Sequence, residues 1–338
     1  INLLSAGFVD GNKVVTVDAT GESSRDLALS QFTGSVHNLI AQRLDTPLKP
    51  VQVAALTGSA GLYFAARNPL AWGQFFGGKL YRDAEASAVG YDTTHGGVNF
   101  GYEWDVNSTR VGLMGGFSKG KTEADTASFK TLTDSYYIGA YGSVKLGRVN
   151  LTTSLLAGVS DSDNERLVID NLNGAEVAHA DVSSRFISPS VRVDAAFKIT
   201  DKVELRPSMS VNYSVAFMDN YQETGTTSSN LTVADRTLQV FTTRAQLAAA
   251  YPLYAATELE FRAGVSARNG SSDDVDARVA GNAFSYSNAG DENAIGGFVG
   301  SRLRIAARDN LNLLVDLELG GDSNERFVNG QVRLDYKF

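Results

Sequence analysis

The sequence of 338 residues contains no cysteine, only 6 prolines and 3 methionines, and no long apolar run. The absence of cysteine excludes disulfides, thiolate metal sites and cysteine nucleophiles. No segment approaches the roughly 18 consecutive apolar residues that a membrane-spanning helix requires, so a helical membrane protein is excluded. The net charge of -8 and the pI near 5.0 argue against a nucleic-acid-binding protein.

Glycine and aromatic residues are abundant instead, with 33 Gly, 13 Tyr and 17 Phe. Glycines are frequent where strands bend around a barrel, and aromatic rings are frequent at membrane interfaces. The strands of a membrane barrel alternate lipid-facing and lumen-facing residues, so such a barrel is compatible with the modest hydropathy of this chain. The sequence starts at Ile1 without a Met or a signal peptide, and we therefore expect it to be part of a larger precursor.

Residues 24–45 carry the pattern of a single helix. Ser24 is a candidate N-cap, and Thr46-Pro47 predicts the end of the helix. About twenty residues at a rise of about 1.5 Å give roughly 30 Å, which matches the hydrocarbon thickness of a bilayer. The apolar positions at helical spacing are Leu29, Phe32, Val36, Leu39 and Ile40.

From about residue 71 onwards, apolar and polar residues alternate with a period of two. Between Val203 and Phe217 every second residue is apolar except for Pro207, and the segments reach about ten residues, as expected for strands that cross a bilayer at a tilt. We predict an all-β, up-and-down antiparallel barrel of about twelve strands. The predicted strands begin near 71, 89, 109, 131, 148, 184, 202, 236, 257, 293, 310 and 328.

The predicted connections alternate between tight turns and long polar links, as in outer-membrane barrels. Tight turns are expected at 105–108, 147–148, 200–201, 252–256 and 307–310, and long links near 118–130, 160–181, 218–234 and 269–291. An even number of strands places both barrel ends on one side, and the tight turns identify that side as the periplasm. The chain closes with a strand in which Val332, Leu334, Tyr336 and Phe338 alternate with polar residues. This terminal aromatic pattern resembles the signal that the barrel-assembly machinery reads.

Three segments together resemble the opening hairpins of the autotransporter (type V secretion) β-domain. They are Trp72–Gly78 (WGQFFGG), Gly90–Tyr102 (GYDTTHGGVNFGY) and Val111–Ser118 (VGLMGGFS). The family begins its barrel with a Trp-led strand, a Gly-Tyr-Asp turn into a Gly-Gly strand, and a Gly-rich third strand. The resemblance covers roughly residues 24–338.

The resemblance implies a twelve-stranded barrel with the helix inside its pore, acting as an outer-membrane translocator that anchors its passenger and assists its export. It divides the chain into 1–22 (the end of a passenger), 23–50 (pore helix and linker) and 51–338 (barrel). Its implied partners are outer-membrane lipid, the barrel-assembly machinery and the chain's own N-terminal passenger. We expect a monomer whose N-terminus lies at the cell surface and whose C-terminus lies in the periplasm, with no cofactor and no metal.

Charged residues on the polar face of the strands are expected to line the lumen. Arg43, near the end of the helix, and Asp45 are expected to pair with some of them. The predicted lumen residues are Arg192, Asp194, Glu204, Arg206, Glu260, Arg262, Arg302, Arg304 and Asp316.

Some autotransporters release their passenger when an Asn in the pore helix cyclises. Val36-His37-Asn38-Leu39 resembles that region, but His37 stands where related proteins carry the first of two adjacent Asn. Asn38 remains a weak candidate for self-cleavage, with Glu103 as the activating carboxylate. Otherwise we do not expect an enzyme, because the three His residues show no catalytic spacing.

Two acidic segments, Asp161–Glu165 and the group Asp273, Asp274 and Asp276, are interpreted as solvated loop tips in preference to Ca²⁺ sites. Three alternatives stay open at this point. A passive porin has no need of a helix before its first strand. A barrel enzyme or adhesin needs a polar constellation at one rim. A water-soluble β-sandwich also alternates apolar and polar residues.

Overall fold

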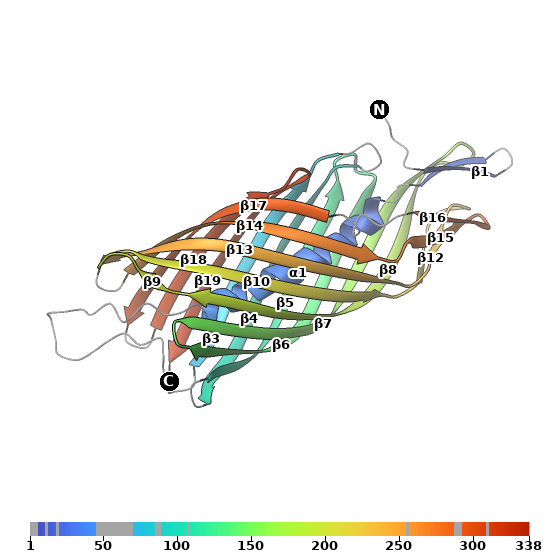
Figure 1. Cartoon of the computed structure of the whole chain (residues 1–338). Coiled ribbons are helices and arrows are strands. Elements are labelled where there is room, and N and C mark those ends of the chain that lie inside the picture. Colours follow the sequence, from blue (N-terminus) through green and yellow to red (C-terminus); the bar gives the residue numbers. More distant parts are fainter. Residues whose placement is uncertain are drawn as a thin grey trace.

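The computed structural model describes residues 6–10, 13–17, 20–44, 70–84, 89–106, 109–254, 257–286, 293–308 and 311–337. It is a closed, twelve-stranded antiparallel barrel with a helix inside (Figure 1). The barrel strands are β3 (Leu70–Arg82), β4 (Tyr91–Val106), β5 (Thr109–Ala124), β6 (Phe129–Leu146), β7 (Val149–Asp170), β8 (Gly174–Ala195), β10 (Glu204–Met218), β13 (Arg236–Tyr254), β14 (Thr257–Ser272), β17 (Asn293–Arg308), β18 (Leu311–Gly321) and β19 (Glu325–Lys337).

The barrel closes because its last strand pairs with its first. β19 runs antiparallel to β3, from Lys337 opposite Leu70 to Glu325 opposite Arg82. Every other barrel strand pairs with the barrel strands before and after it in the sequence. Closure leaves no sheet edge in the lipid, which is the condition for a β-structure to span a membrane. The predicted fold class is confirmed.

Eleven of the predicted strand starts lie within three residues of the observed ones, and the sixth is wrong. It was expected near 184, but β8 begins at Gly174. The expected long link at 160–181 is mostly strand, because β7 continues to Asp170 and only three residues separate it from β8. Asp161–Glu165 is therefore part of a strand and not a loop tip, and His179 lies on β8.

The polarity of the outer face explains this error. On β7 the outward residues are mainly apolar from Val149 to Val159 and then change to Asp161, Asp163 and Glu165. About ten residues at ~3.3 Å each, tilted by about 40°, give roughly the 25 Å height of a lipid-facing band. Beyond the band the outer face meets water, so a polar sequence there can continue the strand ladder.

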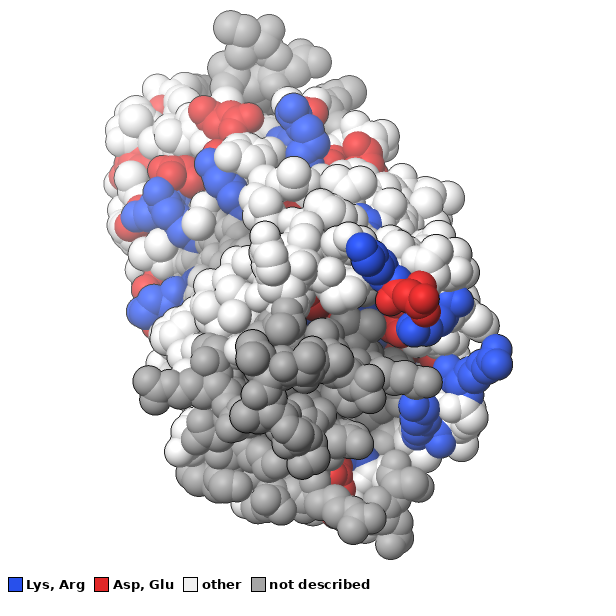
Figure 2. Space-filling view, turned by 90° about the vertical axis from the view of Figure 1, so that its left-hand side faces the viewer, with Lys and Arg blue, Asp and Glu red and all other residues white. Residues whose placement is uncertain are grey.

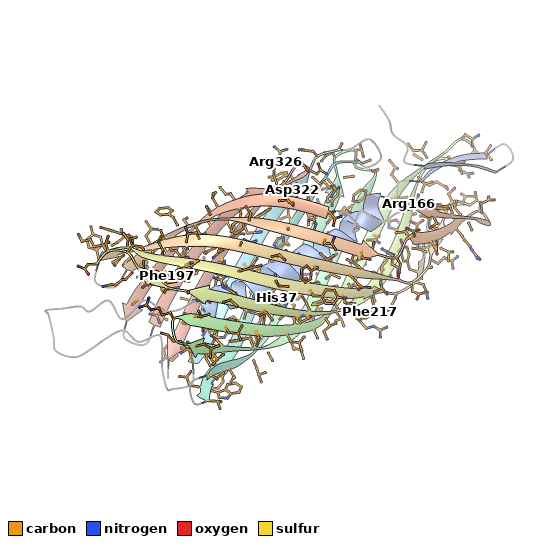
Figure 3. The ribbon with its side chains drawn as sticks, viewed as in Figure 1. His37, Arg166, Phe197, Phe217, Asp322 and Arg326 are labelled. Carbon is orange, nitrogen blue, oxygen red and sulfur yellow. The ribbon has the colours of Figure 1, made fainter. Side chains whose placement is uncertain are left out.

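Two further links contain strands of their own. β11 (Tyr221–Gln222), β12 (Leu231–Val233), β15 (Val275–Val279) and β16 (Asn282–Tyr286) form a separate four-stranded sheet. Its apolar side packs on Ala180 and Val182 of β8. Arg166 of β7, which is labelled in Figure 3, donates hydrogen bonds of 2.8 and 2.5 Å to the two carboxylate oxygens of Glu223. The described parts of the links near 218–234 and 269–291 thus form a small sheet at one end of the barrel.

Residues before the helix form the expected short β-rich pieces. β1 (Ala6–Asp10) pairs with β2 (Lys13–Val17), and β2 touches the extended part of β7 where Val15 lies opposite Asp170. The remaining short strand, β9 (Phe197–Lys198), pairs with the start of β10. Figure 1 shows β1 beside the far end of the β7–β8 hairpin, at the opposite end of the barrel from β9.

The helix α1 runs from Thr20 to Leu44. It begins four residues before the predicted start, so Ser24 is not its N-cap; the Ser24 hydroxyl donates to the carbonyl of Gly21 inside the helix. The predicted end at Thr46 is close to Leu44. Among the described residues, no helix is both long enough and apolar enough to cross a membrane.

The outer surface of the barrel carries large apolar side chains, as a lipid-facing surface requires. Phe75, Phe100 and Ile138 are exposed by 63%, 61% and 71%. Phe197 and Phe217 point outward near different ends of the barrel (Figure 3). Figure 2, viewed from the left-hand side of Figure 1, shows Lys and Arg side chains beside Asp and Glu side chains with uncharged surface between them.

Candidate functional site

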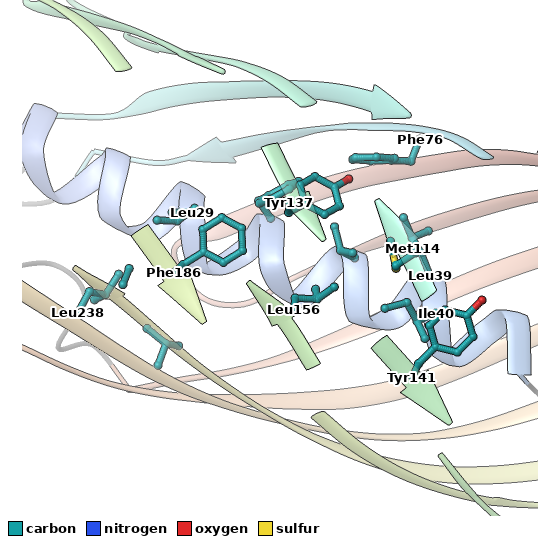
Figure 4. Packing of buried hydrophobic residues seen from close by; sticks show 14 of the residues in the cluster. Leu29, Leu39, Ile40, Phe76, Met114, Tyr137, Tyr141, Leu156, Phe186 and Leu238 are labelled. Carbon is teal, nitrogen blue, oxygen red and sulfur yellow. The ribbon is translucent and has the colours of Figure 1, made fainter. Parts of the chain in front are cut away.

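The candidate functional site is the lumen of the barrel, which contains α1. The lumen wall is apolar on one side of the helix and charged on the other. On one side, apolar helix residues pack on inward side chains of β3 and β5–β8. This packed wall consists of Phe76, Met114, Tyr137, Leu156 and Phe186, all buried (Figure 4). The helix contributes the predicted residues Leu29, Phe32, Val36, Leu39 and Ile40, which are all buried in the same cluster.

Phe32 lies at the centre of this packing. Its ring centroid is 5.2 Å from that of Tyr137 and 6.2 Å from that of Phe186, both in edge-to-face geometry. It is 6.4 Å from the ring of Phe76. Aromatic pairs at these distances add to the gain from apolar burial, so Phe32 fixes the rotation of α1 against the packed wall.

Hydroxyl groups complete the contact on this side. The two ring nitrogens of His37 lie 2.9 Å from the Ser154 hydroxyl and 2.8 Å from the Ser188 hydroxyl. The Thr33 and Ser214 hydroxyls lie 2.8 Å apart. Figure 3 shows His37 inside the barrel. Small hydroxyl side chains let the helix backbone approach the wall while its polar groups stay hydrogen-bonded.

The last turn of α1 is held by charge. The Arg43 guanidinium donates to the carboxylates of Glu103 and Asp335 and lies 4.7 Å from the ring centre of Trp72. The hydroxyl of Tyr141 also donates to Glu103, at 2.8 Å, and Trp72 donates to that hydroxyl at 2.8 Å. Arg43 thus joins residues of four strands, and its fork of N–H donors suits such a set.

Two glycines make room for these rings. A Cβ on Gly101 would lie 2.6 Å from the Trp72 ring, and one on Gly112 would lie 2.4 Å from the Tyr141 ring. Each aromatic side chain therefore lies flat against the neighbouring strand at a position that only glycine allows. The aromatic contacts around Arg43 thus explain two of the glycines in the opening strands.

The opposite side of the lumen is a charged wall, which consists of Glu260, Arg262, Arg302, Asp316 and Glu318. Arg262 donates hydrogen bonds of 2.7 and 2.8 Å to Asp316 and is 3.0 Å from Glu318. Arg302 bridges Glu260 at 3.1 Å and Asp316 at 3.0 Å. Buried charges persist only when paired, and here each cation meets at least two carboxylates.

The structure places all nine predicted lumen residues on the inner side. Eight are buried, and Glu204 is partly buried with its carboxylate 2.9 Å from Arg206. The prediction missed the partners of Arg43, since neither Glu103 nor Asp335 was among the nine, and Asp45 lies outside the described residues. A signal was present in the terminal strand, where Asp335 alternates with the outward Leu334 and Tyr336.

Asn38 and Glu103 occupy different levels of the lumen. Glu103 accepts hydrogen bonds from Arg43 and Tyr141, whereas Asn38 lines a cavity together with Ser35 and His95. Arg43 is five residues after Asn38, which corresponds to about 7.5 Å along the helix axis.

The residues of the expected assembly signal lie on the outer face of β19. Val332, Leu334 and Tyr336 are exposed by 41%, 46% and 45%, and Phe338 lies outside the described residues. Within the described ranges, no three His, Cys, Asp or Glu side chains are grouped so that they could hold a metal ion.

Comparisons with known proteins identify one family and several solved structures of similar fold. The family model described as the autotransporter β-domain matches residues 71–318. No curated protein sequence matches the chain significantly.

The chain is similar in fold to the translocator domain of the autotransporter NalP from Neisseria meningitidis. The TM-score is 0.75 at 14% identity, over 95% of this chain and 100% of that one. It is also similar to the β-domain of the Bordetella autotransporter BrkA, with a TM-score of 0.59 at 14% identity over 80% and 100% of the two chains. A mutant of the TodX monoaromatic hydrocarbon channel gives a TM-score of 0.50 at 9% identity over 82% and 92%.

Proposed function

Because the chain belongs to the autotransporter β-domain family, we propose that α1 stays in its lumen as a plug and as the tether of a passenger. Membership makes the chain an outer-membrane translocator unit, which anchors a linked passenger and assists its export to the cell surface. Translocator domains are in general not enzymes. The observation that carries the proposal is the set of contacts that Arg43 makes at the end of the helix.

These contacts fix the last turn of the helix to the lumen wall. Arg43, Glu103 and Asp335 are nearly inaccessible, with side-chain exposures of 3%, 2% and 7%. Above them the packed wall holds one face of the helix. A porin needs an open lumen, so the filled lumen favours the translocator function over the passive channel.

The test is single-channel conductance in planar bilayers. Residues 1–338 are compared with a chain starting at Thr46 and with the full-length variant Arg43→Ala. We expect a nearly closed parent, a large steady pore in the truncated chain and frequent openings in the variant. Heat-modifiable migration in gels checks that each barrel is folded. Equal conductance of all three folded proteins would show that the helix is not a plug and would favour a porin.

The orientation follows from the connections. β3 starts and β19 ends at the side of the barrel where the tight turns lie, and outer-membrane barrels keep tight turns in the periplasm. The N-terminus of α1, the β1–β2 hairpin and the extended β7–β8 hairpin are then at the cell surface. In this arrangement residues 1–22 correspond to the end of the passenger, 23–50 to the pore helix and its linker, and 51–338 to the barrel domain, and the boundary at 22 falls in the first turn of α1, which begins at Thr20.

We further propose that the passenger stays attached. Glu103 is engaged with Arg43 and Tyr141, and His37 is held between two serines, so neither favours an attack by Asn38 on its own carbonyl. Cells that produce the chain should yield one species of full mass in both the parent and Asn38→Ala. A fragment that ends at Asn38 in the parent alone would establish self-cleavage.

The outward row Val332, Leu334 and Tyr336, together with Phe338, is proposed as the segment that the barrel-assembly machinery binds, and the translocator as a monomer. Removal of Phe338 should slow the appearance of the heat-modifiable barrel in cells. Deletion of Lys337 alone, which keeps a terminal aromatic residue, is a partial control. Equal assembly rates for the parent and the Phe338 deletion would contradict the assignment.

A further inference from the structure

The face of α1 that is turned away from the packed wall borders open space. A cavity of about 130 Å³ lies beside Gly34, Ser35 and Asn38 and reaches the strand ends at Ala294 and Asp322. A second cavity of about 40 Å³ shares Ser35 and Asn38 and extends to Gln42. A water molecule needs about 10–15 Å³ of such volume and two to four polar partners, so both spaces can hold water.

Gly34 keeps the larger cavity wide. A Cβ at this position would have no neighbour within 4 Å, so the folded helix does not need glycine for close packing. Glycine inside a helix costs about 1 kcal/mol relative to alanine. Nothing in the packing compensates for this cost, but the glycine leaves the space beside the helix free.

The smaller cavity is lined by Gln42 and Gln331, which belong to a chain of three glutamines. Gln74 donates to the side-chain oxygen of Gln331, and Gln331 donates to that of Gln42. All three side chains are buried. Arg43 and its carboxylates follow directly after Gln42 along the helix.

We propose that α1 and the part of the lumen wall that runs from β10 through β14–β19 to β4 enclose a water-filled half-channel whose gate is the glutamine chain Gln42–Gln331–Gln74. The proposal rests on the proposed function, because it requires α1 to stay in the lumen. When the gate is broken, small ions pass alongside a helix that remains in place. Discrimination between cations and anions is weak, because Arg262 near the gate is paired with Asp316 and Glu318.

The first test measures the access of water to the cavities through introduced cysteines. The chain has no cysteine of its own, so only the introduced thiol can react. Ser35→Cys and Asn38→Cys are compared with Val36→Cys, whose side chain is fully buried in the packed cluster. We expect a charged methanethiosulfonate to modify the two cavity thiols readily and the Val36→Cys thiol roughly tenfold more slowly, because a buried thiol forms little thiolate. Equally slow reaction at all three sites would show a dry cavity and overturn the proposal.

The second test separates ion passage beside the helix from loss of the helix. The Thr33 and Ser214 hydroxyl oxygens are 2.8 Å apart, so the pair Thr33→Cys and Ser214→Cys can lock α1 to β10 by a disulfide. In the locked protein, Gln42→Ala with Gln331→Ala should raise the KCl conductance several-fold above the locked parent.

The matched control is Asn150→Ala, which removes the amide that donates to the Leu44 carbonyl at 3.2 Å near the same end of the helix. It should leave the conductance of the locked protein unchanged. If the locked glutamine variant conducts no more than the locked parent, the half-channel is wrong while the plug stands. If the unlocked parent already conducts like the chain starting at Thr46, the plug itself is wrong. The two failures are therefore distinguishable.

Discussion

The packed wall and the charged wall of the lumen stabilise different parts of the protein by different interactions. The packed wall binds α1 through apolar contacts, such as those of Tyr137 and Phe186 with Phe32, and through small hydroxyls. The charged wall consists of ion pairs between strands, such as those of Arg302 on β17 with Glu260 on β14 and Asp316 on β18. The first stabilises the helix in the barrel, whereas the second stabilises the barrel itself.

The difference fits the two requirements of a translocator. A barrel that passes a polypeptide needs a lumen that stays open and wet, and paired charges give walls that do not collapse onto each other. A helix that remains in such a lumen needs one surface that binds it. One side of α1 is bound by apolar packing, and the side that carries Ser35 and Asn38 borders water-sized cavities.

The largest effect on the barrel is expected from a substitution in the charged wall, which tests whether this wall stabilises the barrel. Arg262→Met removes a buried cation that Asp316 and Glu318 share and leaves Asp316 to Arg302 and Glu318 to Arg244. The cluster then holds one unmatched buried carboxylate charge, which should cost about 3 kcal/mol. The loss is expected in the barrel, and it is measured as a lower temperature of heat-modifiable unfolding. Arg326→Ala is the control, since its pair with Asp83 is solvent-exposed on both sides. An unchanged transition in Arg262→Met would mean that the charged wall does not stabilise the barrel.

A substitution at the packed wall contacts should weaken the docking of α1 and leave the stability of the barrel unchanged. Phe32→Ala removes the contacts with Tyr137, Phe186 and Phe76, and the expected loss of helix docking is about 3 kcal/mol. Conductance openings should become frequent, while the heat-modifiable transition of the barrel stays near that of the parent. A barrel transition that falls as far as in Arg262→Met would remove the distinction between the walls.

A smaller effect is expected from the hydroxyls of the packed wall. Thr33→Val keeps the shape but loses the hydrogen bond to Ser214, which should cost about 1 kcal/mol of docking free energy. Measuring Ser214→Ala and the double variant completes a double-mutant cycle through the opening probability of the channel. Full additivity would show that the two hydroxyls do not interact.

The smallest effect is expected from a pair of like charges on the outer face. On the extended hairpin beyond the apolar band, Asp163 of β7 lies directly opposite Asp181 of β8. Like charges placed opposite each other destabilise a sheet by about 0.2–1 kcal/mol, so Asp163→Asn should slow amide exchange at the hairpin tip. Glu165→Gln is the control, because Glu165 is paired with Lys130. Faster exchange in Asp163→Asn would contradict this explanation.

The sequence predicted the barrel well because its period of two follows from the medium on each face. It failed at 160–181, where the outer face turns polar above the lipid and the same alternation no longer separates strand from loop. It predicted that Leu29, Phe32 and Val36 share one side of a helix, since that depends on the helical repeat alone.

What the sequence by itself determined was local: the strands, the helix and the face on which each side chain lies. The partners of Arg43 and the glutamine chain were decided only by the tertiary structure. Glu103 and Asp335 are separated from Arg43 by 60 and 292 residues, and they meet it only because closure of β19 on β3 fixes the register of the strands around the helix. Register and closure are properties of the whole sheet, so no local pattern contains them.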